Sequence, residues 1–222
     1  MSETVSNESP VQQSRTPDKV VRHTLIDRLY HWLMAIAFFV LMGTAFLPIL
    51  GVKFEWIDLH WMSGVLLSVL VLVHIVRAMI WQDWRNMMIW PSDIRDIFRG
   101  LAATFSSTAP LPAKPGKYNP LQKLFHLGSA VFVLAIVGTG LTMLLKIDTP
   151  FWRRNPYILS NDTWGWIYAA HGLCAMAMIT MIIIHVYFAL RPDELHLTKS
   201  MFRGWITRKE YKDHYDSDQW RA

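Results

Sequence analysis

Four stretches of the chain carry no Asp, Glu, Lys or Arg and are almost wholly apolar. They lie between Arg28 and Lys53, between Asp58 and Arg77, between Lys123 and Lys146, and between Asp162 and Arg191. Each is close to or above the ~18–20 residues that an α-helix needs to cross the hydrocarbon core of a bilayer. The pattern predicts four membrane-spanning helices, over about 30–50, 59–80, 124–145 and 164–190.

The segments around these runs have other patterns. Residues 92–99 place apolar side chains at helical spacing with charges opposite them, which predicts a short helix at the membrane interface. Residues 106–117 are rich in Ser, Pro and Ala and predict a loop. Tryptophan is concentrated at the ends of the four runs, as expected for side chains at the level of lipid headgroups.

Polar tails flank the apolar part of the chain. Residues 1–22 have no apolar core or small-residue cleavage site, so we expect a disordered cytoplasmic tail instead of a signal peptide. Residues 201–222 are expected to form a second cytoplasmic tail. The predicted fold is therefore all-α and integral to the membrane, with a four-helix up-and-down bundle over residues 23–200.

The excess of Lys and Arg, a formal net charge of +5, follows the topology of the chain. These residues cluster in the two tails and in the connection between the second and third runs, and the other two connections have few. Such alternation is the usual signal for cytoplasmic segments, so it favours membrane topology over nucleic-acid binding. Both termini are predicted to be cytoplasmic, in a multi-pass membrane protein.

Histidines are the candidate chemical groups inside the apolar runs. The chain has nine, and six lie within or at the mouth of a predicted span: His31, His60, His74, His126, His171 and His185. His60 and His74 are fourteen residues apart, as are His171 and His185. At ~1.5 Å per residue and ~100° per residue, each pair shares one helix face and is separated by roughly 21 Å.

This spacing places histidines at two depths of an up-and-down bundle. His60 is expected level with His171 near the outer surface. His74 is expected level with His185 near the inner surface, and His31, at the mouth of the first helix, reaches the same inner level. Spacing alone leaves His31 and His74 as alternative partners of His185.

Paired imidazoles at two levels favour two b-type haems. Neutral imidazoles on both sides of a porphyrin saturate the iron and suit electron transfer. Zinc needs three or four ligands converging on one point, and a proton-relay transporter would normally use carboxylates inside the membrane, which these spans lack. The chain has no C-x-x-C-H motif, so haem would be held without thioether bonds, and Cys174 is expected to be a small packing residue.

Two further groups of residues fit such a cofactor. Arginines and lysines at the cytoplasmic helix ends are candidates to pair with haem propionates: Arg28, Arg77, Lys123 and Arg191. Glycines in the spans would let a porphyrin approach the backbone, or else allow close helix packing: Gly43, Gly64, Gly128, Gly138, Gly140 and Gly172.

Several stretches of the sequence resemble one family of membrane cytochromes. They are Arg28-Leu29-Tyr30-His31-Trp32, Leu59-His60-Trp61-Met62-Ser63-Gly64, Lys117-Tyr118-Asn119-Pro120-Leu121-Gln122-Lys123, His171-Gly172, His185-Val186-Tyr187 and Met201-Phe202-Arg203-Gly204-Trp205-Ile206-Thr207-Arg208. Together these stretches resemble the cytochrome b (gamma) subunit of membrane-bound formate dehydrogenases. That subunit is related to hydrogenase cytochromes b and bacterial cytochrome b561. The resemblance covers about Asp27 to Trp220.

The resemblance implies four axial ligands and a quinone site. It pairs His60 with His171 at an outer haem b and His31 with His185 at an inner one, and so favours His31 over His74. It also implies a pocket for menaquinone or ubiquinone beside the inner haem, for which Asn119, Gln122 and His185 are the candidates. Leu121 departs from the family, which usually has Gly there.

The expected function is electron transfer between an extracytoplasmic iron–sulfur (beta) subunit and the quinone pool, in either direction. A catalytic (alpha) subunit is expected to carry the substrate chemistry, because this chain has no ligand set for molybdenum, nickel or an iron–sulfur cluster. The complex as a whole is expected to be an oxidoreductase, and it could associate into a higher oligomer. The alternatives are a stand-alone cytochrome b561-like quinone oxidoreductase and the cytochrome b subunit of a hydrogenase or periplasmic reductase.

Overall fold

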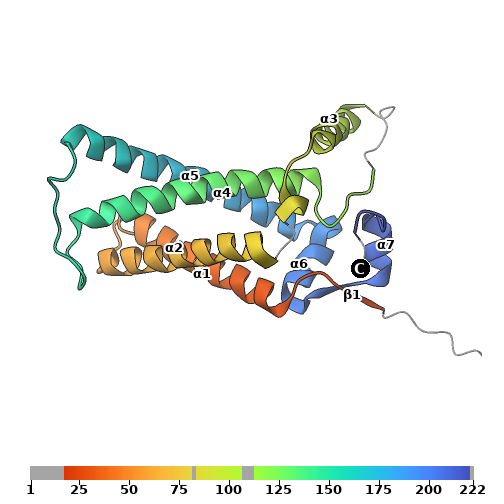
Figure 1. The fold of residues 1–222 in the computed structure, drawn as a ribbon, viewed down its shortest axis with the longest axis horizontal. Helices are drawn as coiled ribbons and strands as arrows, with labels where there is room; N and C mark the ends of the chain where they lie inside the picture. The colour runs from red at the N-terminus through yellow and green to blue at the C-terminus, as the bar shows by residue number, and fades with distance from the viewer. Residues whose placement is uncertain (1–17, 82–83, 107–112, 221–222) are drawn as a thin grey trace, which may run out of the picture.

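The computed structural model describes residues 18–81, 84–106 and 113–220, and its four long helices lie side by side as a bundle (Figure 1). They are α1 (Leu25–Phe46), α2 (Trp56–Trp81), α4 (Pro120–Met143) and α5 (Asn161–Leu190). All four are long and apolar enough to cross a membrane. The prediction of an all-α bundle with four spans is therefore confirmed.

Three of the four helices start on a polar capping residue a few positions before the apolar run. The Thr24 hydroxyl accepts a hydrogen bond from the amide of Asp27 at 3.2 Å, and the Ser160 hydroxyl accepts one from the amide of Thr163 at the same distance. These side chains satisfy backbone donors that have no partner within the helix. The helices consequently begin slightly earlier than the loss of charge along the sequence indicates.

The bundle consists of two helical hairpins. In one hairpin α1 packs along α2, and in the other α4 packs along α5. Contacts between α2 and α4 join the two hairpins. The single-turn helix η2 (Leu144–Lys146) extends α4, and most large apolar side chains of the spans point outward. Lipid tails would cover this outward surface, so the apolar exterior is what a membrane bundle requires.

An amphipathic helix, which follows α2 and precedes α4 in the sequence, lies beside the bundle. It is α3 (Pro91–Phe105), which stands off to one side in Figure 1 and follows the short helix η1 (Trp84–Met87). The prediction of a helix over 92–99 is confirmed, and the structure extends it by two turns. Phe98 and Phe105 on its apolar face are 64% and 84% exposed.

The two polar tails fold together at one end of the bundle. Strand β1 (Lys19–Val21) pairs antiparallel with β2 (Trp205–Thr207), flanked by α6 (Leu195–Arg203) and α7 (Arg208–His214) after the short helix η3 (Pro192–Glu194). Figure 1 shows these elements gathered beside the end of α1. We refer to β1, α6, β2 and α7, together with residues 215–220, as the tail cap; its core is Val20, Ile206, Tyr211 and Tyr215, with Leu197 and Trp220 against it.

The tail cap differs from the solvated tails expected from the sequence. Residues 19–21 form a strand, and Arg22 is buried, whereas residues 1–17 lie outside the described part of the chain. A tight turn at Gly204 closes the pairing, with a φ of +88° and a carbonyl that accepts from the amides of Arg22 and His23. A Cβ at Gly204 would lie 3.0 Å from the His23 carbonyl oxygen, so the turn requires glycine.

Candidate functional site

His60 and His171 each contact a threonine of the neighbouring helix in their own hairpin. The Nδ1 atom of His60, on α2, lies 2.8 Å from the hydroxyl of Thr44 on α1. The Nδ1 atom of His171, on α5, lies 2.9 Å from the hydroxyl of Thr139 on α4. In both hairpins, therefore, a threonine hydroxyl of the neighbouring helix holds the histidine ring.

These contacts assign the tautomer of both rings. The Thr44 hydroxyl lies 2.8 Å from the carbonyl of Val40, and that of Thr139 lies 2.6 Å from the carbonyl of Ala135. A hydroxyl has one proton, which it donates to the carbonyl, so it must accept from the Nδ1–H of the imidazole. The Nε2 atom of each ring then keeps its lone pair and is available as a metal ligand.

Both rings line one apolar cavity inside the bundle. Its volume is about 450 Å³, and all four long helices contribute to its wall. Phe38, Met42, Leu67 and Ile179 are among the lining residues. A cavity of this size, within the ~300–1,000 Å³ typical of cofactor and ligand pockets, with two imidazoles as its nitrogen donors, fits a porphyrin and its iron.

A glycine lies in close contact with one of these rings beside the cavity. A Cβ at Gly140 on α4 would lie 3.2 Å from the Cε1 atom of His171, whereas a Cβ at Gly138 would meet nothing within 4 Å. Gly140 thus lets the imidazole of His171 lie directly against the α4 backbone. The sequence left porphyrin approach and helix packing as alternatives for the span glycines; the neighbour at Gly140 is the His171 ring, and a Cβ at Gly138 has no neighbour within 4 Å among the described residues.

A second pair of rings lies at the end of the bundle near the tail cap. The ring centroids of His31 on α1 and His185 on α5 are 6.4 Å apart. Two imidazoles bound to one metal at about 2 Å per bond would have centroids roughly 6.3 Å apart, given a ring radius of roughly 1.1 Å. The Nδ1 atom of His31 is buried and has no hydrogen-bond partner among the described residues.

His74 lies beside a different set of rings at the same end. Its ring stacks on that of Tyr30, with centroids 5.4 Å apart, and its centroid lies 6.2 Å from that of the His126 ring on α4. His185 instead faces His31 and stacks on Phe125, with centroids 5.5 Å apart. Of the two alternatives that the spacing leaves open, His31 is the one in ring contact with His185.

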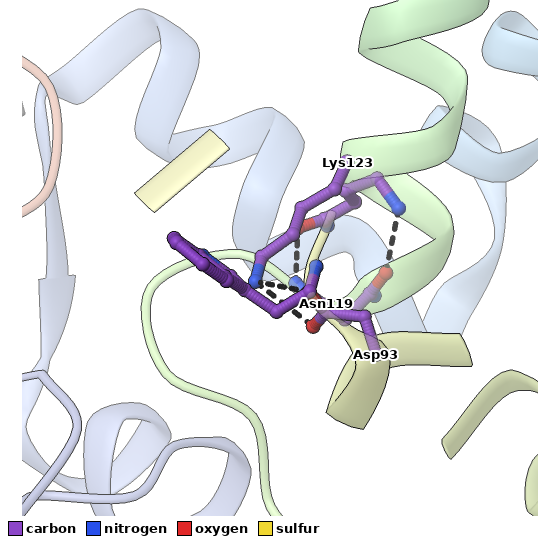
Figure 2. A network of polar contacts seen from close by, with 5 residues as sticks. Asp93, Asn119 and Lys123 are labelled. Carbon is purple, nitrogen blue, oxygen red and sulfur yellow. Dashed lines mark hydrogen bonds and ion pairs between the residues drawn. The ribbon is translucent and has the colours of Figure 1, made fainter. Parts of the chain in front are cut away.

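The quinone-site candidates Asn119 and Gln122 form the start of α4. The side-chain oxygen of each accepts a hydrogen bond from the backbone amide of the other. The distance is 2.8 Å from Gln122 N to Asn119 Oδ1 and 3.1 Å from Asn119 N to Gln122 Oε1. Figure 2 shows Asn119 next to the ion pair of Lys123 with Asp93, whose nearest atoms are 2.9 Å apart. With both oxygens engaged in the cap, the amide nitrogens of Asn119 and Gln122 are the groups that suit a quinone carbonyl.

The four cations considered as propionate partners already have protein partners. Arg77 pairs with Asp27 at 2.5 Å, Lys123 with Asp93 at 2.9 Å, and Arg191 with Asp193 at 3.0 Å. Arg28 donates from Nη1 to the carbonyl of Phe202. Its Nε is buried and lacks a partner among the described residues, so Arg28 has a donor left for a carboxylate.

Sequence reasoning missed Thr44 and Thr139 as functional residues. Thr44 precedes its histidine by 16 positions and Thr139 by 32, because the hairpin loops differ in length. The two threonine–histidine pairs therefore have no common sequence spacing by which they could be recognised. A search for a small hydroxyl residue facing each histidine across its hairpin would have found both.

Comparison with known proteins places these features in a family context. The family described as prokaryotic cytochrome b561 matches residues 22–204. A formate dehydrogenase cytochrome b556(fdo) subunit of Escherichia coli strain K12 is 24% identical over 218 residues, covering 89% of this chain and 90% of the relative.

Two other relatives show similar coverage. The formate dehydrogenase cytochrome b556 subunit of Haemophilus influenzae is 23% identical over 215 residues, covering 89% of this chain and 81% of the relative. A probable Ni/Fe-hydrogenase B-type cytochrome subunit of Bradyrhizobium diazoefficiens is 24% identical over 219 residues, covering 84% of each. The resemblance suggested by the histidine and Asn119 stretches is thus confirmed.

Proposed function

This chain belongs to the prokaryotic cytochrome b561 family, and we propose that it is the di-haem cytochrome b subunit of a formate dehydrogenase-like respiratory complex. Family membership implies haem b and a redox role in the membrane. The observations that carry the finer proposal are that His60 and His171 line one cavity and that the ring centroids of His31 and His185 lie 6.4 Å apart.

We propose these four histidines as the axial ligands, the first pair at an outer haem and the second at an inner one. His74 is the alternative to His31, and its contacts with Tyr30 and His126 argue against that alternative. When bound, two haems b would give the membrane a pair of one-electron carriers between an iron–sulfur subunit and a quinone. Thr44 and Thr139 orient the outer ligands by accepting their Nδ1–H bonds.

The proposed quinone site lies at the start of α4, beside the inner pair. Phe125 lies one turn after Gln122 and stacks on His185, so the amide groups of Asn119 and Gln122 and the ring of His185 belong to one neighbourhood. The amides would donate to the quinone carbonyl as charge develops on it. Protons would enter from the side of the tail cap, which we propose to be cytoplasmic, as the distribution of Lys and Arg favours.

This topology places the outer pair near an extracytoplasmic partner. We propose a multi-pass protein of the bacterial inner membrane in which an iron–sulfur (beta) subunit docks near His60 and His171 and a catalytic (alpha) subunit carries the substrate chemistry. The similarity to formate dehydrogenase subunits over most of both chains supports this partner set. Because another relative is a probable hydrogenase cytochrome subunit, a hydrogenase complex is the second candidate.

Purification from native membranes in mild detergent tests this proposal. We expect a complex that contains iron–sulfur signals in its electron paramagnetic resonance (EPR) spectrum, a b-type haem spectrum and molybdenum or tungsten. Nickel in place of these metals would move the assignment to the hydrogenase candidate. A di-haem protein that purifies alone, without any iron–sulfur polypeptide, would instead support a stand-alone cytochrome b561-like oxidoreductase.

A further inference from the structure

Arg22 is a buried cation whose partners are a carbonyl and aromatic rings. Its residue exposure is 3%, and its Nη2 donates to the carbonyl of Lys117 at 2.8 Å. The guanidinium carbon lies 4.9 Å from the ring centre of Tyr215, 5.3 Å from that of Trp220 and 5.8 Å from that of Tyr118. Nε and Nη1 are buried without a hydrogen-bond partner among the described residues.

Burial of this kind is unfavourable for a charged group and therefore calls for a reason. Desolvation lowers the pKa of Arg22 below its ordinary value of 12.5, while Tyr215, Tyr118 and the carboxylate of Glu194 oppose this effect. A guanidinium nevertheless stays protonated at neutral pH. The positive charge is held where the faces of three rings can interact with it, between the tail cap and the segment that leads into α4.

The segment that Arg22 contacts is held by the C-terminal tail as well. The carbonyl of Pro115 accepts from the amide of Asp216 at 2.9 Å, and Lys114 Nζ donates to the carbonyl of Lys212 at 2.8 Å. A Cβ on Gly116 would lie 3.2 Å from the Cβ of Gln219. Residues 113–118, which we call the α4 lead, are thus packed on the tail cap directly before Asn119.

We propose that Arg22 is a positioning residue for the quinone: its guanidinium fixes the α4 lead on the tail cap and thereby sets the position of Asn119 and Gln122. This inference rests on the proposed function. It gives the tail cap a role, since both tails of the chain are used to hold the segment in front of the proposed quinone site. Arg22 need not touch the quinone itself.

Arg22→Lys and Arg22→Met separate this role from simple packing. Lysine keeps the charge but lacks the fork that reaches the Lys117 carbonyl, and methionine keeps much of the volume without charge. Arg203→Lys is the matched control, because Arg203 lies over the ring of Trp205 at 5.7 Å in the same cap but on an exposed face. A b-type spectrum after dithionite reduction checks that each variant binds haem.

The test is anaerobic reduction of the purified full chain by menadiol in stopped flow. For both Arg22 variants we expect the half-saturating menadiol concentration to rise about tenfold, because displaced amides of Asn119 and Gln122 would lose about one hydrogen bond to the quinone. The limiting rate should change less than about twofold. Hydrogen exchange should become faster in residues 113–118 and stay unchanged in β1 and β2. The Arg203 control should match the wild type in both measurements.

Two results would overturn the inference in distinguishable ways. If menadiol reduces the wild type and both variants with the same half-saturation, the tail cap does not position the quinone site, and the proposed function stands. If menadiol fails to reduce the wild type while dithionite succeeds, the proposed quinone reaction itself is refuted, and the role of Arg22 falls with it.

Discussion

Two threonine hydroxyls bear on which nitrogen of His60 and of His171 is available to a metal. Because Thr44 and Thr139 donate to their own helix carbonyls, they accept from Nδ1–H and leave Nε2 with its lone pair. The orientation of an imidazole and its basicity as a ligand both depend on such a partner. The histidine spacing indicated candidate ligands from the sequence, with His31 and His74 as alternatives, whereas the threonine contacts became visible only when the helices were placed side by side.

Removing either hydroxyl should weaken haem binding at the outer site. Thr44→Val and Thr139→Val keep the side-chain shape and delete the acceptor of the Nδ1–H bond, a change that typically costs ~10–100-fold in metal-site affinity. Haem content per chain and the EPR spectrum of the oxidised protein measure the effect. Thr142→Val is the control, since the Thr142 hydroxyl donates to the Gly138 carbonyl of its own helix and contacts no histidine among the described residues. Equal haem content in all three variants would contradict the role of the threonines.

Gly140 and Gly138 provide a matched pair of substitutions on one helix. Gly140→Ala brings a methyl group to 3.2 Å from the His171 ring and should displace it, whereas Gly138→Ala meets nothing within 4 Å. We expect the first variant to bind haem about tenfold more weakly at the outer site and the second to behave like the wild type. Haem titration of the purified chain distinguishes them. A full-strength haem complex in Gly140→Ala would show that the ligated His171 ring does not lie against the α4 backbone.

At the scale of elements, one largely buried ion pair fastens α3 to the beginning of α4. Lys123 and Asp93 are 13% and 10% exposed, and Asp93 also accepts from the backbone amide of Trp90 at 2.7 Å (Figure 2). Removing one partner of a buried pair leaves the other charge uncompensated. The position of α3 beside the proposed quinone site therefore depends on this contact.

Asp93→Asn should release α3 from the bundle. Breaking a buried pair on one side costs about 3–5 kcal/mol, which exceeds what the few other contacts of so exposed a helix would offset. Hydrogen exchange across residues 91–105 should accelerate strongly. Asp96→Asn is the control, because its pair with Arg99 is partly exposed and 3.7 Å long, a type worth about 0–1 kcal/mol. Similar exchange in the two variants would exclude Asp93 as the anchor.

The elements of this chain differ in how well the sequence predicts them. The four spans follow directly from apolar runs long enough to need no tertiary partner, and α3 follows from the amphipathic pattern of its residues. The strands β1 and β2 do not, because each has three residues and gains its stability from the other, about 185 positions away in the sequence. Arg22 shows the same limit, since a charged residue in a polar tail predicts exposure.

At the scale of the whole molecule, the two tails close one end of the bundle, on the side of His31 and His185. A titratable group, His23, lies at the edge of the tail cap, next to Arg22 in the sequence, and its backbone amide donates to the carbonyl of Gly204. Burial, and next the charges of Arg22 and Lys117, lowers the pKa of His23 to about 4 from its ordinary value of 6.5. Between those two values an unfolded tail binds more protons than the folded cap.

The tail cap should therefore be most stable above about pH 6.5 and lose stability as the pH falls towards about 4. Hydrogen-exchange protection of β1 and β2, corrected for the intrinsic effect of pH on exchange, is the measurement. His23→Gln removes one titrating group and should weaken this dependence, leaving the part that comes from His196 of α6, whose pKa burial also lowers. If wild-type protection stays constant between pH 6.5 and 4.5, His23 is not held in its neutral form by the cap.

The central claim is that His60 pairs with His171, and His31 with His185, to hold two haems. Haem quantification together with reduced-minus-oxidised spectra of six single Ala variants tests it most directly. The wild type should bind two haems b per chain, and the His31, His60, His171 and His185 variants should each lose one. His74→Ala and His126→Ala should keep both. Loss of a haem from His74→Ala with both retained in His31→Ala would contradict the assignment.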